Sequence, residues 1–201
     1  MTVIETTVRP LVIVGVDQSL ASSGMVLVKV DPTRAFLSED PTSVSGTECV
    51  QVLWKGLLAS AIAIEGSANI IERGVTLIDA FESHLIHLRS TAKMQGDYLH
   101  AIIYETPPSA NRMQRPESSL VAAVALCYAA KRLNIDTIAF SANSAKRFFT
   151  GYANAKKSAV KERLLEMYPH IVDDRLNEHQ MDALALVIAS TMPKPALAAS
   201  A

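Results

Sequence analysis

Two kinds of hydrophobic pattern alternate along the chain. Continuous apolar runs at 11–16 (LVIVGV), 24–30 (GMVLVKV) and 99–104 (LHAIIY) are typical of strands buried in a sheet. Weaker apolar segments at 48–55 and 137–141 predict two more strands. Only a few small residues separate the first two runs, which favours an antiparallel hairpin.

The second pattern is a helical one. Apolar residues spaced three, four and seven apart predict a long helix over 68–88. An Ala-rich helix at 118–133, an amphipathic helix at 156–168 and a final helix at 178–190 follow, with a helical turn at 144–149 that Gly151 ends. Pro169 blocks any continuation of the helix before it.

This order of elements predicts an α/β fold. Strands followed by alternating helices and strands indicate a five-stranded mixed sheet flanked by helices. We expect the first three strands to be antiparallel and the last two to be parallel to the first. One domain is expected over residues 1–192 of the 201-residue chain, with a disordered tail at 193–201. Residues 31–47 read as a loop, and 56–66 favour no element.

The composition is that of a globular protein with a full core. Hydrophobic residues make up 49% and charged residues 19% of the chain. The formal net charge of −1 argues neither for nor against binding of nucleic acid. Residues 131–163, however, include eight basic and two acidic residues, which gives a local charge of +6. Such an excess is expected where a polyanion approaches an acidic site, although most charge runs are solvated faces.

Several classes are disfavoured. The chain has two cysteines, Cys49 and Cys127, and so few in a chain of this size favour a reducing compartment without a disulfide framework. Neither has CxxC or zinc spacing. The N-terminal residues lack the basic and long apolar parts of a signal peptide. No uncharged apolar run has the length of a membrane span. We therefore expect a cytoplasmic protein without a membrane anchor.

Two of the apolar runs end on an acid. Asp17 follows the run at 11–16 and Glu105 follows the run at 99–104. If these strands are parallel neighbours, both carboxylates lie at the edge where open α/β sheets build their sites. Two unpaired like charges are costly to bury, and a divalent cation removes that cost.

The last helix offers further ligands. His179 and Asp182 are three residues apart, so they share a helix face, and the apolar continuation ALALVIA packs that helix on the sheet. Together with Asp17 and Glu105 they can converge on one or two hard cations such as Mg²⁺. Two ions about 3.5–4 Å apart can activate a water and stabilise the leaving oxygen of a phosphodiester.

Each of these residues also has an ordinary interpretation. An acid after a strand is often a turn residue or a solvated strand end. An acid early in a helix is favoured by the helix dipole, and a single histidine is more often a surface or capping residue than a ligand.

Four segments carry a family resemblance. VGVDQSLASSGMVLV resembles the opening hairpin of the RuvC-like Holliday junction resolvases, which have the RNase H-like fold, and AIIYETP resembles the strand that bears their second acid. HQMDALALVIA is similar to their closing helix. Residues 146–151 with 155–160 are similar to their basic segment. The order of elements matches over about residues 11–190.

The resemblance implies a nuclease that makes paired nicks in four-way (Holliday) DNA junctions as a homodimer. It implies Asp17, Glu105, His179 and Asp182 as the catalytic positions that hold Mg²⁺ or Mn²⁺. It also makes Lys146 and Lys157 candidates for contact with the scissile phosphate or its neighbours, with Lys157 as the catalytic lysine. The candidates for DNA contact are basic and polar residues of the basic segment and of the loop after Glu105: Asn111, Arg112, Arg115, Lys146, Arg147, Lys156 and Lys157.

The sequence departs from the family pattern in three places. His179 stands where many members have an acid, so it is either a softer ligand that favours Mn²⁺ or a general acid or base. Gln-Ser follows Asp17 in place of Pro-Gly or Pro-Ser. Residues 31–66 are longer and less regular than the corresponding family region.

Alternatives to the resolvase therefore stay open. One is an RNase H-like nuclease acting on flaps, forks or RNA–DNA hybrids. Another is a junction-binding protein with a weak site. A sugar-kinase-like ATPase ranks last, because the chain has no second phosphate-binding Gly loop. The Ala-rich helix at 118–133 either forms a dimer interface or packs on the sheet.

Overall fold

A computed structural model describes residues 10–19, 22–31, 49–59, 70–107 and 116–192. Its strands are β1 (Leu11–Asp17), β2 (Ser22–Val30), β3 (Val50–Ala59), β4 (Leu99–Glu105) and β5 (Asp136–Phe140). Its helices are α3 (Ile70–Met94), α4 (Pro116–Arg132), α5 (Ala142–Thr150), α6 (Lys157–Met167), the 3₁₀ helix η1 (Pro169–Asp174) and α7 (Glu178–Thr191).

The strands form one mixed sheet in the order β3-β2-β1-β4-β5. Neighbouring strands among β1, β2 and β3 are antiparallel, whereas β4 runs parallel to β1 and β5 parallel to β4. Both features confirm the predicted α/β sheet. The predicted loop at 31–47 and the tail at 193–201 lie largely or wholly outside the described residues.

Element boundaries differ from the prediction where pairing in space decides them. β3 continues past residue 55 to Ala59, because it pairs along all of β2 up to Ser22. α3 continues past residue 88 because Ala92 is still buried, and the chain leaves the helix direction at Gly96, whose φ is +77°. The 3₁₀ helix η1 was not predicted, since a segment of 6 residues is too short for a hydrophobic periodicity to be detected.

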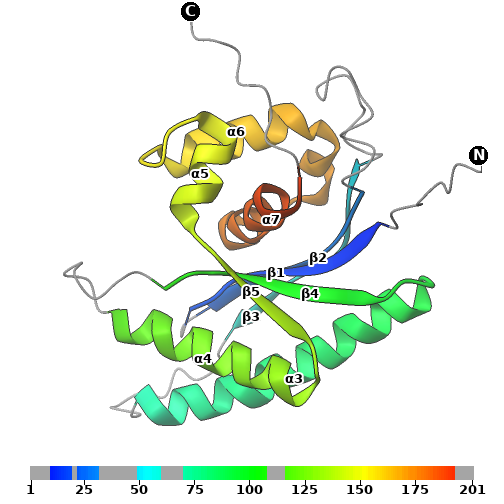
Figure 1. Cartoon of the computed structure of the whole chain (residues 1–201), viewed down its shortest axis with the longest axis vertical. Coiled ribbons are helices and arrows are strands. Elements are labelled where there is room, and N and C mark those ends of the chain that lie inside the picture. The colour runs from blue at the N-terminus through cyan, green and yellow to red at the C-terminus, as the bar shows by residue number, and fades with distance from the viewer. Residues whose placement is uncertain (1–9, 20–21, 32–48, 60–69, 108–115, 193–201) are drawn as a thin grey trace, which may run out of the picture.

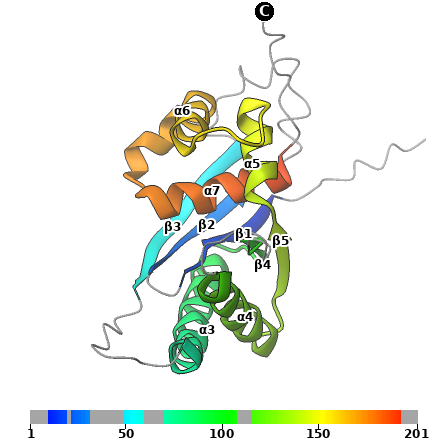
Figure 2. The same ribbon diagram turned by 90° about the vertical axis from the view of Figure 1, so that its left-hand side faces the viewer.

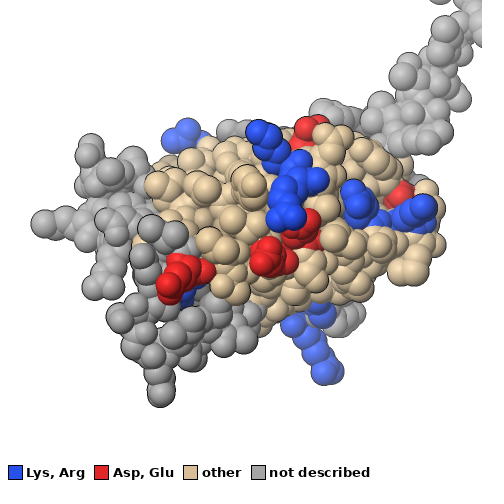
Figure 3. Space-filling model, turned by 90° about the horizontal axis from the view of Figure 1, so that it is seen from below, with Lys and Arg blue, Asp and Glu red and all other residues tan. Residues whose placement is uncertain are grey.

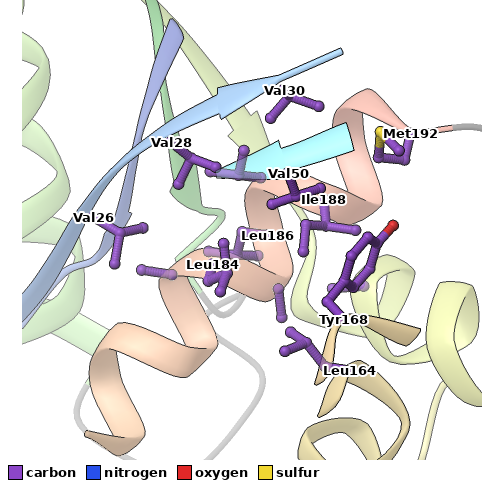
Figure 4. Close-up of a cluster of buried hydrophobic side chains, with 14 of the residues drawn as sticks. Val26, Val28, Val30, Val50, Leu164, Tyr168, Leu184, Leu186, Ile188 and Met192 are labelled. Atoms are coloured by element: carbon purple, nitrogen blue, oxygen red, sulfur yellow. The ribbon is translucent and has the colours of Figure 1, made fainter. Parts of the chain in front are cut away.

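Helices cover both faces of the sheet. In Figures 1 and 2, α3 and α4 lie on one face, and α5, α6 and α7 lie on the other. Each face has its own apolar core. Figure 4 shows the core on the α7 side, where valines of β2 meet Leu184, Leu186 and Ile188 of α7. The strands β1, β2 and β4 are therefore buried on both faces, as their continuous apolar runs predict.

The two-residue period of the strands sends both strand-end acids to the same face. On β1, Val14 and Val16 pack toward α3 and α4, while Ile13 belongs to the core under α7. Asp17 is four residues from Ile13 and so shares its face. On β4, Ile103 belongs to the α7 core and Glu105 follows two residues later. Both acids therefore end at the α7 face, at the carboxyl edge of parallel strands.

Two glycines let α7 lie directly on the sheet. A Cβ added at Gly15 would lie 2.5 Å from the carbonyl oxygen of Ala183, and one added at Gly24 would lie 2.4 Å from the carbonyl carbon of His179. Gly24 is paired with Asp17 across the hairpin. The absence of side chains at these positions therefore brings the first turn of α7 against the end of β1.

None of the helices in the described part of the chain combines the length and apolar character that crossing a membrane requires.

Candidate active site

Asp17 and His179 are in direct contact. Asp17 Oδ2 and His179 Nδ1 lie 2.7 Å apart, with 15% of the aspartate side chain and 45% of the histidine side chain exposed. The first turn of α7 is fixed by a capping box, in which the Asn177 side chain accepts from the Gln180 N–H and the Gln180 side chain accepts from the Asn177 N–H. The histidine is thus presented from a rigid helix start.

Asp182 lies one turn further along α7 and bonds to a lysine. Lys157, the first residue of α6, donates a hydrogen bond from Nζ to Asp182 Oδ2. The same Nζ lies 3.6 Å from the Glu178 Oε1, whose side chain is mostly exposed. The ammonium group of Lys157 therefore joins the starts of α6 and α7, and it lies closer to Asp182 than to Glu178.

Glu105 and Asp182 line a common cleft. The cleft has a volume of about 200 Å³, and its polar lining consists of Glu105, Asn143, Lys146, Lys157 and Asp182. A second cleft shares Lys157 and Asp182 with the first and adds Ser158, Lys161 and Glu178. The surface next to the acids is therefore lined by three lysines, which suits an anionic ligand.

Burial and neighbouring charge act together on the acids. Burial, with a contribution from Asp182, raises the pKa of Asp17 above its ordinary value although the hydrogen bond to His179 opposes the rise. Burial, followed by the charges of Asp17 and Asp182, likewise raises the pKa of Glu105, although Lys157 and Lys146 oppose it. The three carboxylates thus repel one another in a partly desolvated place.

The acidic surroundings favour the charged form of Lys157, whereas they disfavour the charged forms of Asp17 and Glu105. Burial alone would lower the pKa of Lys157, but its hydrogen bond to Asp182 and the charges of Asp182, Asp17 and Glu178 outweigh burial and raise it. Lys157 therefore stays protonated and offsets part of the negative charge.

The residues at this edge fit a divalent cation by their chemistry. Carboxylate oxygens suit Mg²⁺ and Mn²⁺, and carboxylates that repel one another are stabilised when a cation joins them. Within the described residues, no three His, Cys, Asp or Glu side chains are close enough to hold one ion together. His179 and Lys157 bond to the carboxylates instead, so a shared ion requires side-chain movement.

The predicted DNA-contact residues fall into three groups. Lys146 and Lys157 line the cleft beside Glu105. Arg147 and Lys156 are exposed on and next to the same helices but are not among the residues that line either cleft. Asn111, Arg112 and Arg115 lie outside the described residues.

Two further polar residues of the site were not assigned a role from the sequence. Asn143 lines the cleft from α5, and Gln18 hydrogen-bonds to the backbone of Glu105. Gln18 stands out in sequence only as a departure after Asp17, and nothing in a sequence tells which backbone groups a side chain reaches.

The sheet order, the antiparallel opening strands and the helix α7 across them define an RNase H-like α/β fold. The solved structures similar to it include RuvC of Thermus thermophilus in complex with a Holliday junction substrate, with a TM-score of 0.62 and 17% sequence identity over 89% of this chain and 92% of that chain. A second T. thermophilus RuvC structure gives a TM-score of 0.61 and 15% identity with the same coverage. No protein-family model and no curated protein sequence matches the chain. The similarity therefore shows the fold, and the chemistry has to be argued from the site.

Proposed function

We propose that this protein is a metal-dependent endonuclease that resolves four-way DNA junctions by paired phosphodiester hydrolysis. One observation carries the proposal. Three elements far apart in sequence bring Asp17, Glu105 and Asp182 to one sheet edge, beside lysines that line the same cleft. A fold shared with RuvC adds support, because a RuvC structure was solved with such a junction.

In this proposal the carboxylates of Asp17, Glu105 and Asp182, with His179, hold one or two divalent ions. When bound, such ions polarise the attacking water and offset charge on the leaving oxygen. Lys157 stays protonated and lies where it can balance the charge of a phosphate that enters the cleft. The imidazole of His179 makes the site softer than an all-carboxylate one, which favours Mn²⁺ over Mg²⁺.

The proposal includes a homodimer, since two strands of a junction must be cut. A two-fold dimer presents identical sites to the two opposed strands of a nearly two-fold symmetric junction. The Ala-rich face of α4 does not supply the interface, because Ala122, Ala125 and Ala129 are buried in the core shared with α3. The other face of α4 exposes Leu120, Val124 and Tyr128, four residues apart, by 53%, 58% and 53%.

This exposed apolar ridge of α4 (Leu120, Val124 and Tyr128) is the surface we assign to the second copy. α4 lies on the side of the molecule seen in Figure 3, where much of the visible surface is uncharged and charged side chains gather in a few places. Exposed apolar side chains that lie together on one helix face mark a surface for protein–protein contact, and a second copy is the partner that the proposed paired cleavage requires.

Nick mapping on a synthetic four-way junction tests the proposed substrate. The strands are end-labelled in turn, and the junction is incubated with the protein and Mn²⁺ or Mg²⁺. We expect nicks at symmetric positions in two opposed strands. A linear duplex, a flap, a fork and an RNA–DNA hybrid of the same sequence serve as matched substrates, and equal cutting of any of them would contradict junction selectivity.

The same assay separates a second candidate, a junction-binding protein with a weak site. The bonds from His179 and Lys157 to Asp17 and Asp182 favour it, since they hold the carboxylates without a metal. A junction bound tightly in a gel-shift experiment but left uncut with either metal would support this candidate and reject the nuclease.

A further inference from the structure

The pairing between β1 and β4 stops one residue before the two acids. The parallel ladder between the two strands ends at Val16 and Tyr104. Beyond that point the chain of β1 leaves toward β2, and Asp17 pairs with Gly24 across the hairpin. Consequently the N–H and C=O of Glu105, which face β1, have no backbone partner on that strand.

The side chain of Gln18 takes the place of the missing backbone partner. Its Nε2 donates to the Glu105 carbonyl oxygen at 2.6 Å, and its Oε1 accepts from the Glu105 N–H at 3.2 Å. A primary amide carries one acceptor and two donors, so it can satisfy both groups as a peptide unit would. Gln18 is only 5% exposed, so these bonds are made away from water.

On this geometry, and resting on the function proposed above, we propose that Gln18 is a positioning residue for the metal-binding acids. Gln18 is bonded through the chain to Asp17 and through two hydrogen bonds to the backbone of Glu105. The side-chain clamp therefore fixes the spacing between the two carboxylates. Without it, the inter-strand hydrogen bonds at the end of β4 are, among the described residues, those on the β5 side, where the Thr106 N–H donates to the Phe140 carbonyl oxygen.

A purely structural role is the competing explanation, and the opposite end of the same strand pair provides its control. There the Val12 N–H donates to His100 Nδ1 at 3.0 Å, so a second side chain bridges β1 and β4. His100 is close to Leu99, which pairs with Val12 at the start of the ladder, far from the acids along both strands. Removing either bridge should weaken the sheet, but only the loss of Gln18 should loosen the acids.

The experiment compares Gln18→Met with His100→Leu in the full-length protein. Mn²⁺ binding is measured without DNA, from the electron paramagnetic resonance signal of free Mn²⁺. The Mn²⁺ concentration for half-maximal single-turnover cleavage of a four-way junction and the junction Kd are measured in parallel. Loss of a residue that orients metal ligands costs about 10–100-fold in metal affinity or activity.

We expect Gln18→Met to weaken Mn²⁺ binding at least about tenfold and to raise the half-maximal Mn²⁺ concentration by the same factor, with the junction Kd unchanged. His100→Leu should lower the Tm without moving either Mn²⁺ value. Gln18→Asn, whose shorter amide cannot span the same gap, serves if Gln18→Met does not fold. The assignment would be overturned if the parent and the Gln18 variants had the same Mn²⁺ affinity and half-maximal Mn²⁺ concentration. It would also be overturned if the Gln18 and His100 variants shifted these two quantities equally.

The two proposals fail in different ways. If the parent binds Mn²⁺ and the Gln18 variants bind it more weakly, but no DNA is cut, the nuclease is rejected and the positioning role stands. If the parent cuts junctions and the Gln18 variants match it at every Mn²⁺ concentration, the positioning role is rejected alone.

Discussion

Among single residues, Glu105 shows the cost of assembling this site. Burial and the charges of Asp17 and Asp182 raise its pKa above the ordinary value of 4.5. A carboxyl with a raised pKa in the folded state contributes its full stability below the ordinary pKa, and that contribution is lost as the pH rises through the raised value. The metal-free protein should therefore be less stable at neutral pH than an uncharged variant.

Glu105→Gln is accordingly expected to raise the Tm of the metal-free protein at pH 7.5. The gain should shrink as the pH falls and vanish below about pH 4.5, where the parent carboxyl is protonated in both states. Thermal unfolding in EDTA from pH 4 to 8 measures it, with the exposed Glu162→Gln as control. A Tm that falls at pH 7.5 would show that Glu105 is stabilised by its surroundings instead.

A second prediction concerns the charge of Lys157. Lys157→Met keeps the length of the side chain but removes the cation that bonds to Asp182 in the cleft. The cleavage rate should fall by about a hundredfold, the effect of removing one electrostatic group from a transition state. Single-turnover cleavage measures it, and Lys93→Met, on the exposed end of α3, should cleave as the parent does. Equal rates for both variants would remove Lys157 from the mechanism.

The positions of the acids could be predicted from the sequence, whereas the residues that hydrogen-bond to them could not. A strand-end acid and an i, i+3 pair on a helix can be read from local patterns, so the approach of Asp17, Glu105 and Asp182 could be expected. The bond from Lys157 to Asp182 joins residues 25 positions apart, and the bonds from Gln18 to Glu105 join residues 87 apart. Such contacts depend on how helices settle on the sheet, which local periodicity does not encode.

At the level of elements, the site depends on how closely α7 approaches β1 and β2. Gly24 has no side chain where the backbone of His179 passes, and Gly15 has none beneath Ala183. Because both contacts are with backbone atoms, a methyl group at either position cannot be accommodated by a rotamer change. It must push α7 away, and with it His179 and Asp182.

Gly24→Ala is therefore expected to destabilise the protein by about 1–3 kcal/mol, as overpacking does, and to abolish most cleavage by the molecules that remain folded. Gly96→Ala is the matched control. Its Cβ meets nothing within 4 Å, and its φ of +77° alone costs about 1–2 kcal/mol. Chemical denaturation and single-turnover cleavage measure both. Loss of stability without loss of cleavage in Gly24→Ala would contradict the role assigned to α7.

The elements themselves were largely predictable because each has a strong local signal. The antiparallel first hairpin follows from the apolar runs and their short connection, and the predicted directions of the other strands agree with the structure, whereas the order of the strands across the sheet comes from the structure. The end of β3 was wrong by four residues, since an edge strand with exposed Gln51, Lys55 and Leu57 has a weak pattern and takes its length from β2. β5 is similarly exposed but was predicted, with both of its ends placed one residue too late.

For the whole molecule, the proposed function makes paired cleavage depend on a dimer formed through the exposed ridge of α4. Val124→Glu places a charge on the ridge, and Val75→Glu does the same on α3 at almost equal exposure, 58% against 57%. We expect Val124→Glu to be monomeric and to nick single strands without pairing, while Val75→Glu stays dimeric. Light scattering after size exclusion and nick mapping measure this. A parent that is monomeric with junction DNA bound would contradict the dimer.

The proposed active site is tested most directly by Mn²⁺-dependent cleavage of a four-way junction by the parent and by Asp17→Asn. Asparagine keeps the size of Asp17 and removes the charge on which metal binding is proposed to depend. We predict that the parent cuts with Mn²⁺ and not with EDTA, and that Asp17→Asn binds the junction as tightly as the parent but cuts at least about a hundredfold more slowly. Cleavage by Asp17→Asn at the parent rate would contradict the proposed active site.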